Sequence, residues 1–388
     1  MENKSQKSFL FVIFASFFLV GIVFGFFFLN GMWNEIVFLF ITILLLLRFL
    51  FAVFRKIFLY VFLCVFLGFF CGIFRYFLYL DYGGFDFQFL GEYFSFMGER
   101  IDTVFRSVLP EPYSGFVEGL ILGKKNGLGK DLLENFNATG LTHIIAVSGY
   151  NISILIVFCT KFFGFLGQRM KFFVMIFLIV LFVALTGFSA SCIRAAIMGI
   201  VGYYAMFSGR QYMPFIGLIF AAFIMNLFLP TLIFDDIGFQ LSFGATFGIV
   251  CFYPKMENSL KFVPDFLGFR SAFLMTISAQ ILTMPVILLN FGNFSVISPI
   301  ANIFVLPLIP IAMFFGFVIL FVGFFSLKLG MFFAFIEYAV LKFVLFLVEL
   351  FANFPFAYYK IDWFTSEIFF IYYFVAIFFM LKRLIFRS

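Results

Sequence analysis

Residues 172–207 read FFVMIFLIVLFVALTGFSASCIRAAIMGIVGYYAMF, two apolar runs separated by a short polar stretch. Each run comes close to the roughly 20 mostly apolar residues that a membrane-spanning helix requires. The polar stretch, TGFSAS, is followed by Arg194, a charged residue at the start of the second run. The pattern predicts two membrane helices joined by a short loop, with polar side chains gathered at one end.

The rest of the chain repeats this pattern. Of its 388 residues, 65% are hydrophobic and 11% are charged, whereas about 25% of the residues of a soluble globular protein are charged. We therefore expect an all-α polytopic membrane protein with about 10–12 transmembrane helices, some broken or re-entrant, and a small cap on the outer face. The apolar segments are 8–29, 34–54, 57–80, 141–160, 172–188, 192–207, 212–229, 237–253, 271–290, 296–327, 331–353 and 365–381.

Lysine and arginine residues recur in every second loop between these segments. Lys161 and Lys171 lie in one such loop and Lys255 in another, whereas Asp235 and Asp236 lie in a loop of the opposite set. Positively charged loops face the cytoplasm, so we predict a multi-pass protein of the cell inner membrane with both termini in the cytoplasm. The predicted regions are an N-terminal three-span region (1–80), an extracytoplasmic amphipathic segment (81–140), a core with polar motifs (141–327) and C-terminal membrane helices (328–388).

The segment 81–140 is the one long stretch without a predicted span. It contains two short amphipathic pieces, around 96–109 and 113–122, on either side of two prolines. At about sixty residues it is too short for a large independent domain, and we expect a small cap.

Cofactor chemistry has little support in the residues. The five cysteines lie in or beside apolar runs without a C-x-x-C pair, and the chain has one histidine, so we predict neither a disulfide nor a metal site. The turn GKKNGLGK lacks the spacing of a phosphate-binding P-loop, and no strand precedes it. We expect no cofactor and no enzymatic activity.

Polar side chains inside a membrane cost free energy, so each is a candidate functional residue. Here they gather towards the predicted outer ends of several spans. Pro299, Pro307 and Pro310 predict that 296–327 is not one regular helix, and broken helices are tolerated where they line a water-filled cavity. We expect a hydrated vestibule opening outward. The candidates are His143, Ser148, Gly149, Asn151, Arg194, Asp236, Gln240, Gln280, Asn302 and Pro307.

Four segments, in order and covering roughly 115–310, resemble the signature of the ComEC family of competence proteins. They are ILGKKNGLGKDLLENFNATGLTHIIAVSGYNI, TGFSASCIRAAIMG, DIGFQLSFGATFG and SAQILTMP followed by FGNFSVISPIANIFVLPLIP. The resemblance implies an inner-membrane channel that imports single-stranded DNA into the cytoplasm during natural transformation, with 141–327 as its core. The implied partners are single-stranded DNA, an extracytoplasmic DNA receptor, a cytoplasmic motor ATPase, a separate nuclease and further copies of the chain in a homo-oligomer.

The chain departs from that family in three respects. Asn151 stands where the motif commonly has a second histidine. Residues 81–98 are too few for the outer oligonucleotide-binding-type domain of many members. The sequence ends at Ser388 without the metallo-β-lactamase-like domain that many members carry, so we expect the nuclease to be another protein.

A phosphodiester strand requires a wet and only weakly cationic path, because a strongly bound strand could not leave. We expect Arg194 and His143, with backbone and amide donors, to contact phosphate, and Asp236 to pair with Arg194 in a gate. Aromatic side chains along the path would stack on bases.

The residues themselves leave two alternatives open. A proton-coupled secondary transporter of a small anion would use broken helices and buried charges equally well. An intramembrane hydrolase using Ser148 with His143 would require an unwound motif, because residues five apart face different sides of a helix.

Overall fold

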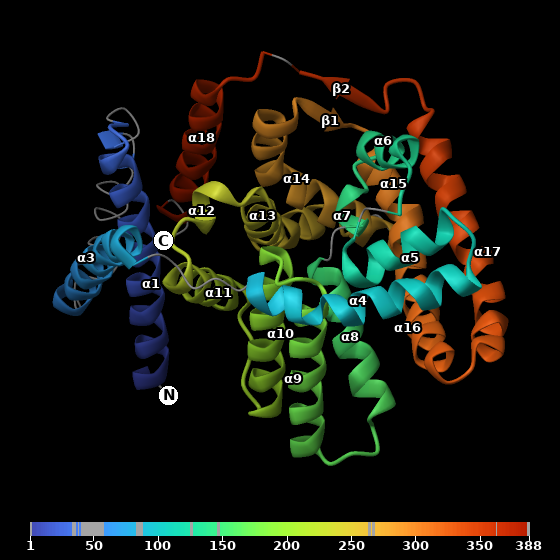
Figure 1. The fold of residues 1–388 in the computed structure, drawn as a ribbon. Coiled ribbons are helices and arrows are strands. Elements are labelled where there is room, and N and C mark those ends of the chain that lie inside the picture. Colours follow the sequence, from blue (N-terminus) through green and yellow to red (C-terminus); the bar gives the residue numbers. More distant parts are fainter. Residues whose placement is uncertain are drawn as a thin grey trace. The chain divides into compact units, whose positions relative to one another are not determined.

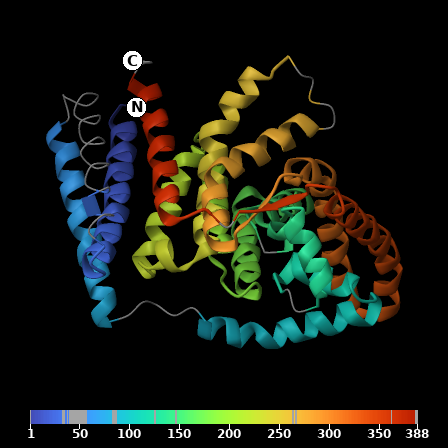
Figure 2. The ribbon, with the colours of Figure 1, turned by 90° about the horizontal axis from the view of Figure 1, so that it is seen from above.

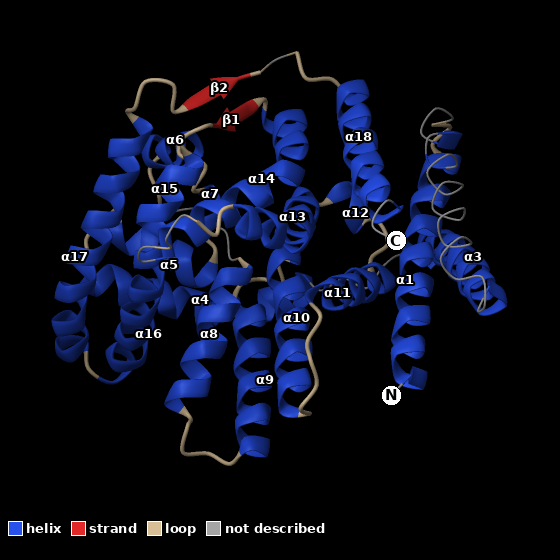
Figure 3. Cartoon of the chain, turned by 180° about the vertical axis from the view of Figure 1, so that it is seen from behind, coloured by secondary structure: helices blue, strands red, loops and turns tan. Residues whose placement is uncertain are grey.

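The computed structural model describes residues 2–32, 36–37, 39, 58–82, 88–124, 127–145, 148–262, 265, 268–361 and 363–385. Within these residues the chain is almost entirely helical, and the one sheet has two short strands (Figures 1 and 3). The all-α prediction is therefore confirmed. The chain divides into two compact units, which are Met1–Asp86 with Met213–Gln240 and Phe370–Ser388, and Phe87–Tyr212 with Leu241–Phe369.

The first unit is built on two long helices that pack against one another, α1 and α3. Both follow from runs of apolar residues without a proline, and α11 packs against α1. The described elements of this unit are α1 (Glu2–Leu29), α3 (Phe58–Tyr82), α11 (Pro214–Phe228), α12 (Leu232–Asp235) and most of α18 (Ser366–Ile385).

Glycines bring the backbones of α1 and α3 into direct contact. A Cβ atom at Gly72 would lie 2.0 Å from the carbonyl oxygen of Phe18, and one at Gly21 would lie 2.1 Å from that of Phe69. The pairs Gly21–Gly25 and Gly68–Gly72 each have the G-x-x-x-G spacing that lets membrane helices approach closely. Sequence reasoning could have found this signal and did not use it.

The second unit contains the four motif segments and most of the helices. One of them, α13 (Ile237–Ser259), begins in the first unit and continues here from Leu241. The other elements are α4 (Gln88–Val108), α5 (Tyr113–Leu122), α6 (Lys130–Ala138), α7 (Thr142–Ile145), α8 (Gly149–Phe162), α9 (Gln168–Leu185), α10 (Ala190–Phe207), α14 (Phe269–Phe291), β1 (Asn293–Ser295), α15 (Ser298–Val305), the 3-10 helix η3 (Leu306–Leu308), α16 (Ile309–Phe325), α17 (Leu327–Ala352) and β2 (Tyr358–Lys360).

The largest apolar core of this unit surrounds α5. All residues from Ser114 to Leu122 are buried, and α4, α16 and α17 pack against this helix. A Cβ atom at Gly316 of α16 would lie 2.8 Å from Ile121, so α5 and α16 are close neighbours. The prediction of an amphipathic piece at 113–122 is therefore wrong, because this helix is buried all round and has no exposed polar face.

A second packed group contains α8, α9 and α10, which stand side by side in Figure 1. Helices α13 and α14 form an antiparallel pair, seen from above in Figure 2. A Cβ atom at Gly248 would lie 2.3 Å from the carbonyl oxygen of Ser278, so this pair also meets at a glycine.

The predicted spans correspond well to the helices. Within the part of the chain that the structure describes, eight helices are long and apolar enough to cross a membrane. Three further predicted spans, 141–160, 212–229 and 365–381, coincide with the shorter apolar helices α8, α11 and α18, and most of 34–54 lies outside the described residues. The segment 296–327 is broken at η3, which contains Pro307, as its prolines predicted.

Candidate functional site

Arg194 is the buried cation of the second unit. It lies on the first turn of α10 and is 8% exposed. Its Nε donates a hydrogen bond to Ser242 Oγ at 2.5 Å and its Nη1 donates to Thr246 Oγ1 at 2.7 Å. Both hydroxyls belong to α13, four residues apart and therefore on one helical face. Arg194 is thus held within this unit by neutral partners.

The amino end of α8 lies against this guanidinium. Ser148 has an extended backbone, and α8 begins at Gly149. A Cβ atom at Gly149 would lie 2.9 Å from Arg194 Nη2. The absence of a side chain at Gly149 therefore lets the helix end approach the arginine, and the positive end of the α8 dipole points to the same place. The first two motifs, far apart in sequence, meet here.

The next residues of α8 connect it to other elements. Asn151 is buried and donates a hydrogen bond from Nδ2 to the carbonyl oxygen of Leu120 in α5 at 3.0 Å, while its Oδ1 accepts one from Ser148 Oγ at 3.3 Å. The Tyr150 hydroxyl donates to the carbonyl oxygen of Leu306 in η3 at 3.3 Å. Asn151 therefore links α5 to the start of α8 by hydrogen bonds.

The fourth motif contacts the turn before α7. Gly140 has a positive φ of 68°, and a Cβ atom there would lie 2.7 Å from Ser298 Cβ. Asn302 is buried in α15 and donates from Nδ2 to Thr276 Oγ1 of α14 at 3.2 Å. Pro307 lies in η3, where it interrupts the segment between α15 and α16.

His143 is exposed on the short helix α7. Its Nδ1 lies 3.0 Å from the carbonyl oxygen of Gly140. A carbonyl only accepts, so Nδ1 carries the hydrogen and Nε2 is left as an acceptor in the neutral ring. Ser148 Oγ donates to Asn151 instead of to the imidazole, so these residues do not form the Ser–His pair of a hydrolase here.

Asp236 and Gln240 belong to the first unit, where both have local partners. Asp236 Oδ1 accepts a hydrogen bond from the backbone N–H of Phe239 at 2.6 Å, which is the arrangement of a helix N-cap. Gln240 Nε2 donates to the carbonyl oxygens of Ile233 and Phe234 at the end of α12. The pairing of Asp236 with Arg194 stays a prediction. Gln280 is half-buried on α14.

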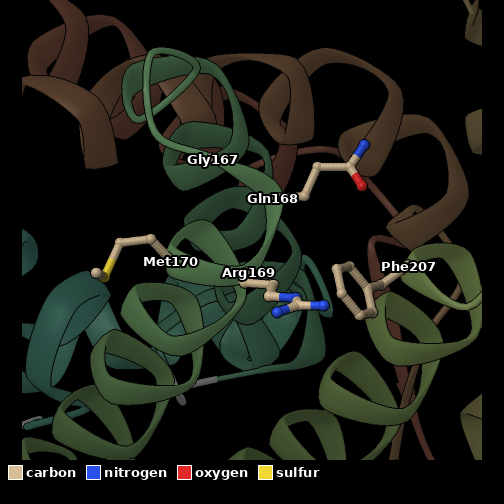
Figure 4. A pocket seen from close by; sticks show the side chains of 5 residues that line it. All are labelled: Gly167, Gln168, Arg169, Met170 and Phe207. Carbon is tan, nitrogen blue, oxygen red and sulfur yellow. The ribbon is translucent and has the colours of Figure 1, made fainter.

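Two hollows are described on the second unit, and none of the ten candidates lines either of them. One, of about 670 Å³, lies between α8 and the start of α16. The other, of about 500 Å³, is shown in Figure 4, where the Arg169 side chain extends towards the ring of Phe207. Phe207 ends α10, 13 residues or about 20 Å from Arg194. Neither hollow reaches Arg194, Gly149 or Asn151, which are packed against neighbouring groups of the unit.

Three buried or half-buried residues of this unit were not among the predicted candidates. Ser242 and Thr246 hold Arg194, and their i, i+4 spacing within an apolar helix was the available signal. Glu337 of α17 is completely buried, and neither of its carboxyl oxygens has a hydrogen-bond partner in the described structure. The available signal was a lone acidic residue inside an apolar run.

Chemically, the site combines one buried guanidinium, a helix amino end and several hydroxyl and amide groups. Such a set suits the reversible binding of an anion. The described residues contain no cluster of three metal-binding side chains. Together with the eight candidate spans and the broken segment at η3, these features define a multi-pass α-helical membrane protein with a polar site on interrupted helices.

The comparisons with known proteins identify the family. The family model described as "Competence protein" matches residues 120–385, so the chain belongs to the competence protein family. ComE operon protein 3 of Bacillus subtilis (strain 168) is 26% identical over 212 residues, which are 54% of this chain and 26% of that protein. The match thus spans about a quarter of the relative's length. No solved structure matches. The resemblance to the ComEC family is confirmed.

Proposed function

We propose that this chain forms the channel through which single-stranded DNA crosses the inner membrane during competence. The observation that carries the proposal is Arg194, buried at the amino end of α8 and held within its unit by hydroxyls. A guanidinium without a carboxylate among these partners can exchange weak hydrogen bonds for a phosphate.

The site is suited to passage more than to tight binding. Each nucleotide carries one phosphate charge, and a path with many arginines would retain the strand. The neutral hydroxyls that hold Arg194, those of Ser242 and Thr246, provide hydrogen bonds without adding charge. The strand would thus meet one cation and several neutral donors in succession.

The arrangement corresponds to a closed channel. Opening requires α8 to separate from α10, where Gly149 meets Arg194, and from α5, where Asn151 holds Leu120. Each neutral hydrogen bond contributes about 0.5–1.5 kcal/mol net, so these contacts present a barrier that a bound strand could offset.

Further parts of the proposal concern the cellular setting. Both termini carry several lysine or arginine residues and lie in the cytoplasm, because positively charged segments stay inside. The loop with Lys360 lies outside, because the loops alternate between the two sides of the membrane. The chain acts as a conduit without enzymatic activity. An extracytoplasmic receptor delivers the DNA, a cytoplasmic motor ATPase pulls it, a separate nuclease removes the other strand, and copies of the chain assemble as a homo-oligomer.

The test is substitution of Arg194. We expect Arg194→Ala to abolish uptake of labelled DNA into the cytoplasm, because the phosphate would meet a desolvated site without a cation. Arg194→Lys should retain part of the uptake, since lysine keeps the positive charge but cannot form the bidentate hydrogen bonds of a guanidinium with phosphate. Membrane insertion and protein amount are measured for each variant by fractionation.

The matched control is Arg169→Ala, which removes an exposed arginine at the opposite end of the α9–α10 pair. This variant should take up DNA normally. Normal uptake by Arg194→Ala at unchanged protein level would contradict the proposal.

A second candidate function is a proton-coupled transporter of a small anion. Glu337 favours it, because a carboxyl group buried in a membrane helix without a partner is typical of proton relays. Deletion of the gene separates the candidates. Loss of transformation with normal growth supports the channel, and loss of growth on one solute supports the transporter.

A further inference from the structure

The strands β1 and β2 form a small antiparallel ribbon in the second unit. Asn293 pairs with Lys360 and Ser295 pairs with Tyr358. The ribbon lies at the end of this unit that carries α6, whereas the α8–α9 loop lies at the opposite end (Figures 1 and 3). A lone two-stranded ribbon is marginally stable in water, so its persistence requires other contacts.

Those contacts join the ribbon to the turn that precedes His143, one of the candidate residues. Ser295 Oγ donates a hydrogen bond to the carbonyl oxygen of Ala138 at the end of α6, at 2.7 Å. Two residues later in the chain, Gly140 packs on Ser298, and its carbonyl oxygen is the partner of His143. The ribbon is therefore anchored to the turn that leads into α7.

The second strand and its flanks are unusually rich in exposed aromatic side chains. All three residues of β2 are exposed. Phe356 and Trp363 are 73% and 69% exposed, and the rings of Phe356 and Tyr359 are stacked with centroids 6.1 Å apart. We call this surface the aromatic ribbon, and it consists of Phe356, Tyr358, Tyr359, Lys360 and Trp363.

We propose that the aromatic ribbon is the outer docking surface for single-stranded DNA, holding bases by stacking and phosphate through Lys360. Exposed aromatic rings next to a cation are the combination that binds single strands without sequence preference. Side chains two residues apart on a strand lie on the same face, so Tyr358 and Lys360 offer a ring and a charge side by side.

The same residue types also occur where membrane helices leave the bilayer. Two observations favour DNA over a lipid headgroup. Strand β2 and the flanking Phe356 and Trp363 are exposed, and the ribbon is tied to the turn before His143, one of the candidate residues. The inference rests on the proposed function, since the ribbon would deliver the strand to the candidate site.

The test uses the whole chain in lipid nanodiscs. The chain has two tryptophans, so Trp33→Phe leaves Trp363 as the single fluorescent reporter. We expect a thymidine oligonucleotide to quench this fluorescence, and an abasic oligomer of the same charge to quench it far less. Tyr359→Ala should weaken oligonucleotide binding by roughly five- to a hundredfold, the effect of removing one stacking ring.

The matched control is Phe165→Ala, which removes an exposed aromatic ring from the α8–α9 loop. It should bind the oligonucleotide normally. If brominated lipids quench Trp363 while the oligonucleotide does not, the ribbon is a membrane-interface surface and the inference is overturned. Equal quenching by the abasic oligomer would also overturn it, because stacking would then contribute nothing.

Failure of this inference can be told apart from failure of the proposed function. If Tyr359→Ala and Trp363→Ala cells take up DNA normally while Arg194→Ala cells do not, the ribbon is wrong and the channel stands. If the purified chain binds through the ribbon but Arg194→Ala cells take up DNA normally, the channel proposal fails and the ribbon stands.

Discussion

At the scale of single residues, the site depends on the absence of one side chain. Gly149 leaves room for the Arg194 guanidinium, whose Nη2 would otherwise lie 2.9 Å from a Cβ atom. The arginine cannot move aside without loss, because Ser242 and Thr246 hold its other nitrogens. The Ser-Gly pair of the motif is thus explained by packing around a cation.

This contact predicts the effect of Gly149→Ala. The new methyl group would displace the guanidinium and weaken a hydrogen bond to a charged group, which contributes about 1.5–3 kcal/mol. Alanine has a higher helix propensity than glycine, which stabilises the helix by about 0.5–1 kcal/mol. We therefore expect the free energy of unfolding to fall by about 1 kcal/mol and DNA uptake to be clearly reduced. Thermal unfolding in detergent and uptake of labelled DNA measure the two effects.

Gly167→Ala is the control, because no atom lies within 4 Å of a Cβ atom at Gly167 and its φ is −57°. Equal behaviour of the two variants would show that the approach of Gly149 to Arg194 has no consequence.

At the scale of elements, glycines determine which helices meet. The backbones of α1 and α3 touch at Gly21, Gly68 and Gly72, and those of α13 and α14 touch at Gly248. Lipid is as apolar as leucine, so burial of apolar side chains does not by itself drive helices together in a membrane. Close backbone approach supplies the dispersion contacts instead.

The α1–α3 contact gives a sharp prediction for Gly72→Ala. Its Cβ atom would lie 2.0 Å from the backbone oxygen of Phe18, which no side-chain movement relieves. We expect the helices to be pushed apart at a cost of about 1–3 kcal/mol, seen as earlier thermal unfolding. Cys71→Ala, at an exposed neighbouring position on α3, should leave the transition unchanged. A stable Gly72→Ala variant would refute the close contact.

At the scale of the whole molecule, the chain is a membrane protein whose loops alternate in charge. Lys161, Arg169 and Lys171 surround the α8–α9 loop, and the aromatic ribbon lies at the other end of the same unit (Figure 1). The positive-inside rule therefore predicts that the α8–α9 loop lies in the cytoplasm and the ribbon outside.

Cysteine labelling checks this orientation. In a chain whose native cysteines are replaced, Phe165→Cys should resist a membrane-impermeant maleimide added to intact cells, and Trp363→Cys should react. Both side chains are exposed, so accessibility within the fold is not the difference. Labelling of both, or of the first alone, would overturn the topology and with it the outer location of the aromatic ribbon.

The sequence by itself determined the class of protein, most helix positions, the break near Pro307 and the four motif segments. These follow from hydropathy, from proline and from residue spacing, which act within a few helical turns. Sequence reasoning failed for α5, because a helix that is buried all round has no distinctive period of its own.

Only the tertiary structure decided which polar groups meet. Arg194 bonds hydroxyls 48 and 52 residues away, and Asn151 bonds a carbonyl 31 residues away. Many neutral groups could satisfy one buried guanidinium equally well, so spacing along the chain cannot choose among them. The choice is made where helix backbones pack closely enough to leave one set of partners within reach.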